Sequence, residues 1–167
     1  STTAARTCTI DRSDGTTDTL TLSNTVDLNN GTSFSLSNTE ILNFANGTTA
    51  VTVATGLLSG ANYLLKHATA ADTLIITAEL GATDTSANFS SLVVDGASLT
   101  AADSIVVDGS AKTSALSLTG VNTMGNTLTG GTKEDTITGG DAADTLDGKN
   151  GADIISGGAG NDIITGG

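Results

Sequence analysis

The sequence predicts an all-β fold, a parallel β-solenoid in which an irregular β-helix continues into a regular C-terminal roll. Three observations indicate it. From Gly130 to Thr165 four nine-residue copies follow one another, reading GGTKEDTIT, GGDAADTLD, GKNGADIIS and GGAGNDIIT. Short β-branched runs recur before them, and three Phe, one Tyr and no Trp leave little aromatic bulk for a conventional core in 167 residues. Such a period is typical of coils that bury a core only jointly.

Each copy divides into a turn of six residues and an extended stretch of three. Glycine opens the turn, where the backbone needs positive φ or has no room for a Cβ. An aspartate closes the turn at the sixth position, and a branched apolar residue follows at the eighth, expected to point inward: Ile137, Leu146, Ile155 and Ile164. Two copies make one coil, so turns on the same side lie 18 residues apart. We therefore expect Asp144 to stack with Asp162 and Asp135 with Asp153.

Stacked carboxylates repel one another unless a cation lies between them. The turns offer carboxylates and carbonyls but no thiolate or imidazole, a donor set that suits Ca²⁺ better than Zn²⁺ or Mg²⁺. The candidate ligands are the side chains of Asp135, Asp144, Asp153, Asp162 and Asn126, and the first and third residues of each turn: Gly130, Thr132, Gly139, Asp141, Gly148, Asn150, Gly157 and Ala159. The alternative is a metal-free solenoid whose aspartates only cap turns.

The four copies resemble the hemolysin-type calcium-binding repeat of RTX proteins, whose nonapeptide pattern is GGxGxDxUx. The resemblance covers residues 120–167, and four copies in register make it specific. It implies a parallel calcium β-roll and, as in RTX families, export through a one-step secretion channel. Two earlier segments, TSFSLSNTEILNF and ANFSSLVV, resemble more loosely the strand-repeat stretches of RTX-containing bacterial surface-layer and adhesin proteins.

Departures from the nonapeptide pattern occur in the first three copies. The fourth position is Lys133 and then Ala142 before it becomes glycine, and Lys149 stands at a second position. One register earlier, VNTMGNTLT keeps Leu128 at the apolar place but has Asn126 where Asp belongs. We interpret this stretch as a transition coil. A site made by Asn126 and Asp144 should bind calcium more weakly than an Asp/Asp site, because an amide oxygen adds no negative charge.

Residues 1–119 are predicted to form the irregular β-helix and residues 120–167 the roll. Strands are expected where β-branched residues cluster, at 19–22, 34–36, 41–44, 51–53, 63–65, 74–77, 92–94, 105–107 and 116–118. Asn-Gly and Asp-Gly turn signals separate them. A separate antiparallel β-sandwich over 1–119 is the alternative, although no Pro-rich or charged linker precedes the repeats. Single helical turns are expected at 55–61 and 77–81.

Composition and the absence of certain motifs exclude several classes of partner and function. Eighteen acidic against six basic residues give a formal net charge of −12, which argues against nucleic acid and anionic membranes as partners. No apolar run approaches the roughly 20 residues that cross a bilayer. Catalytic motifs such as HExxH, GxSxG and CxxC are absent, so we expect no enzyme activity. Because the chain starts at Ser1 without Met and stops at Gly167 inside a repeat, we expect a fragment of a longer protein.

The sequence thus predicts a non-enzymatic calcium-binding structural module of a secreted bacterial surface protein, in a surface layer, adhesin stalk or extracellular filament. Its acidic repeats should stay unfolded until Ca²⁺ binds, and copies should associate through exposed strand ends. Two alternatives stay open. The chain could be the C-terminal folding and secretion module of a protease or lipase, or an ice-binding solenoid, for which Thr127/Thr129 and Thr136/Thr138 begin an outward threonine ladder that then breaks.

Overall fold

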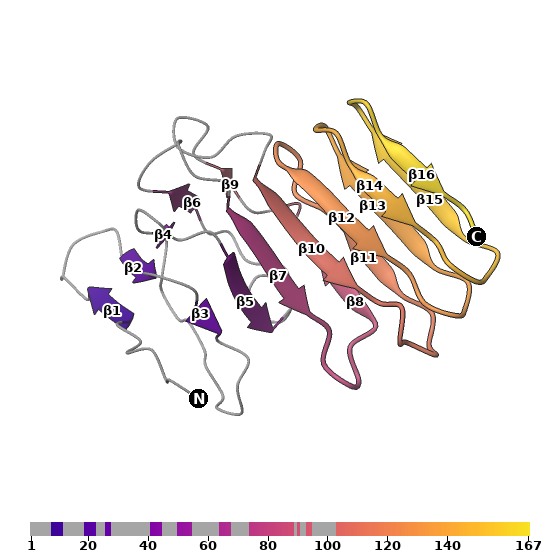
Figure 1. The fold of residues 1–167 in the computed structure, drawn as a ribbon, viewed down its shortest axis with the longest axis horizontal. Coiled ribbons are helices and arrows are strands. Elements are labelled where there is room, and N and C mark those ends of the chain that lie inside the picture. Colours follow the sequence, from indigo (N-terminus) through magenta and orange to yellow (C-terminus); the bar gives the residue numbers. More distant parts are fainter. Residues whose placement is uncertain are drawn as a thin grey trace.

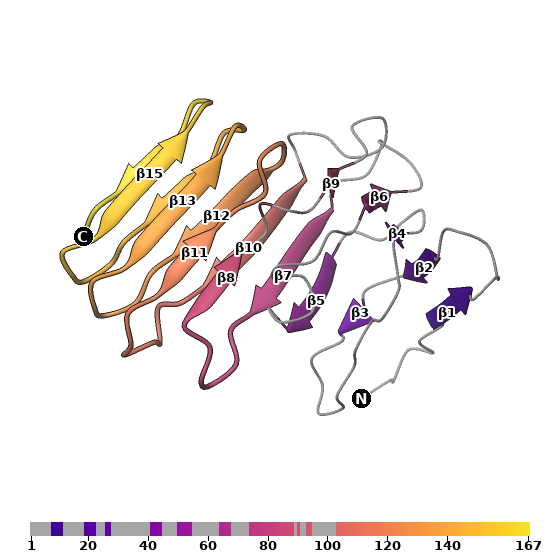
Figure 2. The same ribbon diagram turned by 180° about the vertical axis from the view of Figure 1, so that it is seen from behind.

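Short strands stack along the chain from the N-terminal region to the C-terminal repeats, as Figures 1 and 2 show from opposite sides. The structure is a computed structural model. It describes residues 8–11, 19–22, 26–27, 41–44, 50–54, 64–67, 74–88, 90, 93–94 and 103–167. Within these ranges the regular elements are all strands, and no helix is long and apolar enough to span a membrane.

The strands belong to three sheets. The five-stranded sheet contains β1 (Cys8–Asp11), β2 (Thr19–Leu22), β4 (Ile41–Phe44), β6 (Leu64–His67) and β9 (Val93–Val94). The seven-stranded sheet contains β3 (Val26–Asp27), β5 (Ala50–Ala54), β7 (Ile75–Glu79), β10 (Ser104–Asp108), β12 (Gly125–Thr129), β14 (Thr145–Asp147) and β16 (Ile163–Thr165). The four-stranded sheet contains β8 (Ser86–Asn88), β11 (Ser117–Thr119), β13 (Thr136–Gly140) and β15 (Ile154–Gly158).

Strand pairing confirms the predicted parallel β-solenoid. From β10 to β16 the chain alternates between the seven-stranded and four-stranded sheets, so that each strand pairs with the strand after next. The described pairs are parallel except β1 with β2, which is antiparallel. The predicted alternative of an antiparallel sandwich is therefore wrong for the described strands. The seven-stranded sheet continues from β10 to β12, across the division predicted between residues 119 and 120, and that division stays a prediction.

The nine-residue period sets the register of the C-terminal coils. Thr145 pairs with Thr127 on one side and with Ile163 on the other, and Thr136 pairs with Ile154. Each of these steps is 18 residues, as two copies per coil require. The eighth-position residues Ile137 and Leu146 are fully buried in the interior.

The end coil differs from the predicted inward pattern. Ile164 is 51% exposed, because β16 is the last strand of its sheet and pairs only with β14. Its neighbour Ile163 and the preceding Ile154 are also exposed, at 65% and 69%. Both alternate with inward positions, so their side chains face away from the interior.

The helical turn predicted at 77–81 is wrong. Strand β7 extends through Glu79, and Thr77 pairs with Thr52 of β5 and with Val106 of β10. Pairing on both sides outweighs the weak local signal for a turn. The other turn predicted at 55–61 and the strand predicted at 34–36 lie outside the described residues, whereas the remaining predicted strands overlap observed ones.

Truncating a core residue should destabilise the stack. Leu118 is fully buried in β11 and lies between Ala87 and Ile137 of the neighbouring strands. Leu118→Ala should lower the free energy of unfolding by about 2–5 kcal/mol, because the lost methyl groups leave a cavity that a two-sided stack cannot close. Chemical denaturation at fixed calcium measures the effect. Ser117→Ala, at the exposed neighbouring position, is the control and should change stability by at most about 0.5 kcal/mol.

Candidate metal centre

The sixth-position side chains form two columns at opposite edges of the roll. The first column contains Asn126 in β12, Asp144 before β14 and Asp162 before β16. The second contains Asp135 before β13 and Asp153 before β15. Asp135 and Asp144 are only 1% and 2% exposed, and Asn126 is 2% exposed. The pairing predicted from the period is observed. In each pair, the backbone N–H of the earlier aspartate donates to the carboxylate of the aspartate 18 residues later.

One oxygen of each carboxylate ties its coil to the preceding one. The Oδ1 atom of Asp144 accepts the backbone N–H of Asn126 at 2.8 Å, and Oδ1 of Asp162 accepts that of Asp144 at 3.0 Å. In the second column, Oδ1 of Asp153 accepts the N–H of Asp135 at 2.8 Å. Leu116 donates in the same way to Asp135 at 2.7 Å. These bonds perform the turn-capping role that the metal-free alternative assigns to the aspartates.

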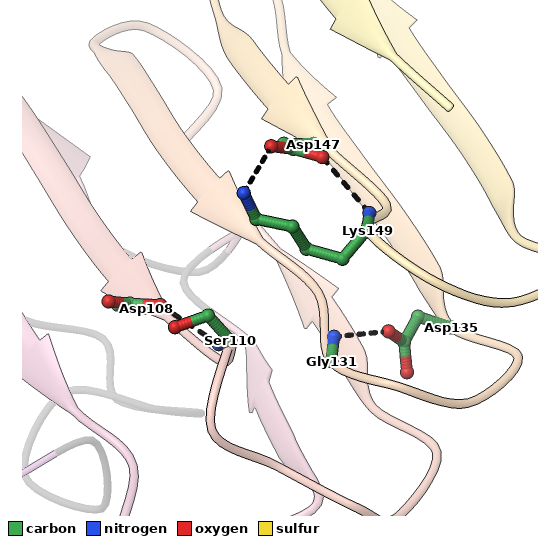
Figure 3. A network of polar contacts seen from close by, with 6 residues as sticks. All are labelled: Asp108, Ser110, Gly131, Asp135, Asp147 and Lys149. Atoms are coloured by element: carbon green, nitrogen blue, oxygen red, sulfur yellow. Dashed lines mark hydrogen bonds and ion pairs between the residues drawn. The ribbon is translucent and has the colours of Figure 1, made fainter. Parts of the chain in front are cut away.

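The second carboxylate oxygens are not all satisfied by the protein. The Oδ2 atom of Asp135 accepts the N–H of Gly131 at 2.6 Å, as Figure 3 shows. The Oδ2 atoms of Asp144 and Asp153 are buried and have no hydrogen-bond partner. Burying an ionised carboxylate oxygen without a partner is costly, so these two atoms are positions where a cation would stabilise the fold.

The charge of Asp144 reflects this environment. Burial raises the pKa of its carboxyl above the ordinary value, and the negative charge of Asp162 acts in the same direction. Hydrogen bonds from Asn126 oppose the rise. The Gly140 amide also lowers the pKa, but its N–H does not reach hydrogen-bonding geometry with Oδ2. A cation beside Oδ2 would favour the ionised form.

The first glycine of each repeat is required for space. A Cβ on Gly139 would lie 2.2 Å from Oδ2 of Asp144 and 2.5 Å from the carbonyl oxygen of Gly157. Gly130 and Gly148 have the same surroundings, an Asp Oδ2 and the carbonyl of the first glycine one coil later, both within 2.6 Å of the added carbon. The missing side chain thus lets a carboxylate and a carbonyl approach the same stretch of backbone.

The backbone conformation at the fourth position of each repeat explains why the first two copies have Lys133 and Ala142 there in place of glycine. Gly151 and Gly160 have positive φ, and a Cβ on them would lie 2.3 and 2.5 Å from the carbonyl oxygens of Lys133 and Ala142. Lys133 and Ala142 themselves do not have positive φ, so side chains are allowed there. Lys149 is the non-glycine residue with positive φ among the described ones, at φ 64°.

The carbonyls complete the candidate donor set. Between stacked turns, the third-position amides of Asn150 and Ala159 donate to the carbonyls of Gly131 and Gly140. Within the described turns the third-position carbonyls themselves accept no backbone hydrogen bond. These carbonyls belong to four of the predicted ligands: Thr132, Asp141, Asn150 and Ala159.

A shallow groove lies between two turns on the same side. It has a volume of about 540 Å³, includes Thr132 and Lys133 of one turn and Gly151 and Ala152 of the next, and continues to residues 113–115 of the coil before. The candidate aspartates do not line it. No three His, Cys, Asp or Glu side chains converge to hold a metal in the described part of the chain. A cation held by the buried aspartates must therefore take carbonyls beside the carboxylates, which fits the coordination of Ca²⁺ and not the nitrogen and sulfur ligands of Zn²⁺.

Asn126 was predicted to contribute an amide oxygen. In the structure this oxygen accepts the backbone N–H of Val121 at 2.8 Å, and the amide nitrogen faces Asp144 instead. The four aspartates stack in the two predicted pairs, although both oxygens of Asp135 accept backbone N–H groups. The structure also brings the first glycines close to the carboxylates. That all these residues bind calcium stays a prediction.

The outer face carries charges that the ligand prediction did not include. The Lys149 ammonium pairs with Asp147 at 2.9 Å, and this hydrogen bond lowers the pKa of the Asp147 carboxyl and raises that of Lys149 (Figure 3). Hydrogen bonds from Ser110 lower the pKa of Asp108. No described Lys or Arg reaches ion-pair distance of Asp135 or Asp144, so these ion pairs leave the buried carboxylates uncompensated.

Sequence reasoning missed one carboxylate of the same kind outside the repeats. Asp103 is 1% exposed, and its Oδ1 atom accepts the backbone N–H of Leu74 at 2.6 Å. The signal was available, because Asp103 stands directly before the strand SIVVD as Asp144 stands before TLD. A buried aspartate that links one coil to the previous one therefore occurs in the chain before the nonapeptide repeats begin.

Comparison with protein families matches residues 122–155 and 139–167 to the RTX calcium-binding nonapeptide repeat, in four copies. No curated protein and no solved structure matches the chain. The matched segment contains both columns, from Asn126 to Asp162. The C-terminal coils of this solenoid are therefore RTX-type repeats.

Proposed function

We propose that this chain is a calcium-binding structural module of a secreted bacterial surface protein, whose C-terminal coils fold when Ca²⁺ binds. The match of residues 122–167 to calcium-binding repeats supports the choice of metal. The observation that carries the proposal is the pair of buried, unpartnered Oδ2 atoms of Asp144 and Asp153. Turn capping through Oδ1 alone does not account for these atoms.

The chain's own residues would act together on the ion. Asp144 and Asp153 would supply carboxylate oxygen, the turn carbonyls would supply neutral oxygen, and the first glycines would keep the two together. Bound calcium would neutralise carboxylates that the fold otherwise buries without compensation. Folding and binding are then one process, because the unfolded chain does not present this donor set.

Calcium titration tests the proposal. At sites with dissociation constants of about 10⁻⁴ to 10⁻³ M, a free Ca²⁺ concentration of about 10 mM should stabilise the roll by about 1.4–2.7 kcal/mol per site relative to chelator. Isothermal titration calorimetry measures binding, and urea unfolding with and without chelator measures the stabilisation. Magnesium is the control ion and should bind at least about tenfold more weakly. Absence of calcium binding together with equal stability in chelator would contradict the proposal.

The proposed location follows from calcium availability. Extracellular calcium modules have dissociation constants in the same range, so the roll would be folded outside the cell and unfolded inside it. RTX repeats occur in secreted bacterial proteins, which supports the export of this protein. Localisation of the full-length product by cell fractionation with antibody detection would test this part, and retention in the cytoplasm would contradict it.

The proposed role is structural, not catalytic. The carboxylates that the structure buries are bound to backbone amides of neighbouring coils, an arrangement that holds a stack together. The side chains of Ile154 and Ile163 are exposed on the outward faces of β15 and β16, which supports association with further copies in a surface assembly. Light scattering during the calcium titration tests the assembly, and scattering that stays constant would contradict it.

A further inference from the structure

Asn126 is the first residue of the first column. At the equivalent position, the coils before it carry buried apolar residues and the coil after it carries an aspartate. On its N-terminal side the paired residue is Ile105, which pairs in turn with Ile76, and both are fully buried. On its C-terminal side the equivalent residue is Asp144, whose carboxylate it contacts. The Asn126 side chain therefore joins a hydrocarbon column to a carboxylate column.

The amide nitrogen of Asn126 lies among three oxygens. Its Nδ2 atom is 2.8 Å from Oδ1 of Asp144, 2.9 Å from the carbonyl oxygen of Val121 and 3.0 Å from that of Met124. The orientation of the amide is fixed by its other end, since Oδ1 accepts the backbone N–H of Val121 at 2.8 Å. Rotating the amide by 180° would place nitrogen against that N–H and oxygen against all three acceptors.

The surroundings of this side chain are fitted to it. Gly120 packs so closely that an added Cβ would lie 2.4 Å from Cγ of Asn126. The oxygens around Nδ2, one carboxylate and two carbonyls, are of the same kinds as those available to a cation between later turns. The N–H groups of a neutral amide present positive partial charge to them without requiring an ion.

The second column begins in a comparable way. Both oxygens of Asp135, its first member, accept backbone N–H groups, from Leu116 and Gly131. The next members of the two columns, Asp144 and Asp153, each keep an Oδ2 atom without a partner. In both columns, protein groups thus form hydrogen bonds with every polar side-chain atom of the first residue. The next residue of each column keeps one carboxylate oxygen without a hydrogen bond.

We propose that the Asn126 amide takes the place of a calcium ion at the first step of the first column, so that the roll starts on a metal-independent coil. Calcium is then first required at Asp144. This inference rests on the proposed function. It assigns Asn126 a different role from the weak calcium ligand that the sequence predicts.

Asn126→Asp tests the inference against the wild-type chain. A carboxylate at this position loses the Nδ2 donors and brings a second negative charge to Asp144, so the step should need an ion. In chelator the equilibrium constant for folding of the coil that contains Asn126 should fall by about tenfold or more. In calcium the variant should bind one more ion than the wild type and recover wild-type stability. Calorimetric stoichiometry and urea unfolding with and without chelator provide the two readouts.

Each other outcome counts against the inference. The same number of ions bound more tightly, with unchanged stability in chelator, would show that Asn126 is an ordinary calcium ligand. A variant whose roll stays unfolded at saturating calcium would also overturn it, because the added ion should compensate the added carboxylate. A wild-type chain that binds no calcium would overturn the proposed function first, and the inference with it.

Discussion

Asp144→Ala and Asp153→Ala are each expected to remove the calcium-dependent part of the stability on one edge of the roll. Each substitution deletes a buried carboxylate whose Oδ2 atom has no protein partner. Calcium affinity at the affected edge should fall at least about tenfold, since even outer-shell changes at metal sites cost 10–100-fold. Calcium titration calorimetry measures the loss.

The control for charge is Asp108→Ala, which removes one exposed carboxylate from β10 outside the repeats. It should leave calcium affinity unchanged. In chelator, Asp144→Ala should change stability much less than in calcium, because it removes an uncompensated charge. The loss on the other side is one acceptor of the Asn126 backbone N–H, while the Asn126 side-chain amide keeps the carbonyls of Val121 and Met124. Equal calcium affinity in wild type and in both column variants would contradict the assignment.

Gly139→Ala is the second substitution with a large expected effect. The added methyl would lie 2.2 Å from Oδ2 of Asp144 and 2.5 Å from the carbonyl oxygen of Gly157, so the carboxylate or the backbone must move. The free energy of unfolding in calcium should fall by about 2–4 kcal/mol, and calcium affinity should fall with it. Thermal or urea unfolding at fixed calcium measures the first effect.

Gly166→Ala is the matched control, because Gly166 occupies the same repeat position at the start of a fifth copy. A Cβ there meets no atom within 4 Å. This variant should be unchanged or stabilised by up to about 1 kcal/mol, since alanine reduces the freedom of the unfolded chain. If the two variants lose the same stability, close packing of carboxylate and carbonyl is not the reason for the first glycine.

The sequence predicted the C-terminal coils in detail because their period is strict. Nine residues per copy placed Asp144 under Asp162 and Asp135 under Asp153, and the structure has both pairs in register. The same period placed Ile137 and Leu146 inward. Before residue 120 the strand spacing varies, so the pairing partners could not be deduced, and the antiparallel pair β1–β2 was not predicted.

The site was predicted at the level of residues but not of atoms. A repeat pattern shows which positions are acidic, whereas it does not show that Oδ1 is used by a backbone amide and that Oδ2 is left over. The orientation of the Asn126 amide depends on the Val121 N–H, a contact five residues away that no spacing rule gives. The crowding of Gly120 against Asn126 likewise depends on how two coils stack.

Amide hydrogen exchange followed by mass spectrometry, with calcium and with chelator, tests the central claim most directly because it locates the folding response in the chain. We expect residues 144–165 to exchange rapidly in chelator and to become protected when calcium is added, while β7, β10 and β11 stay protected in both conditions. Equal protection of residues 144–165 in calcium and chelator would show that the repeats form a metal-free solenoid, and would contradict the account.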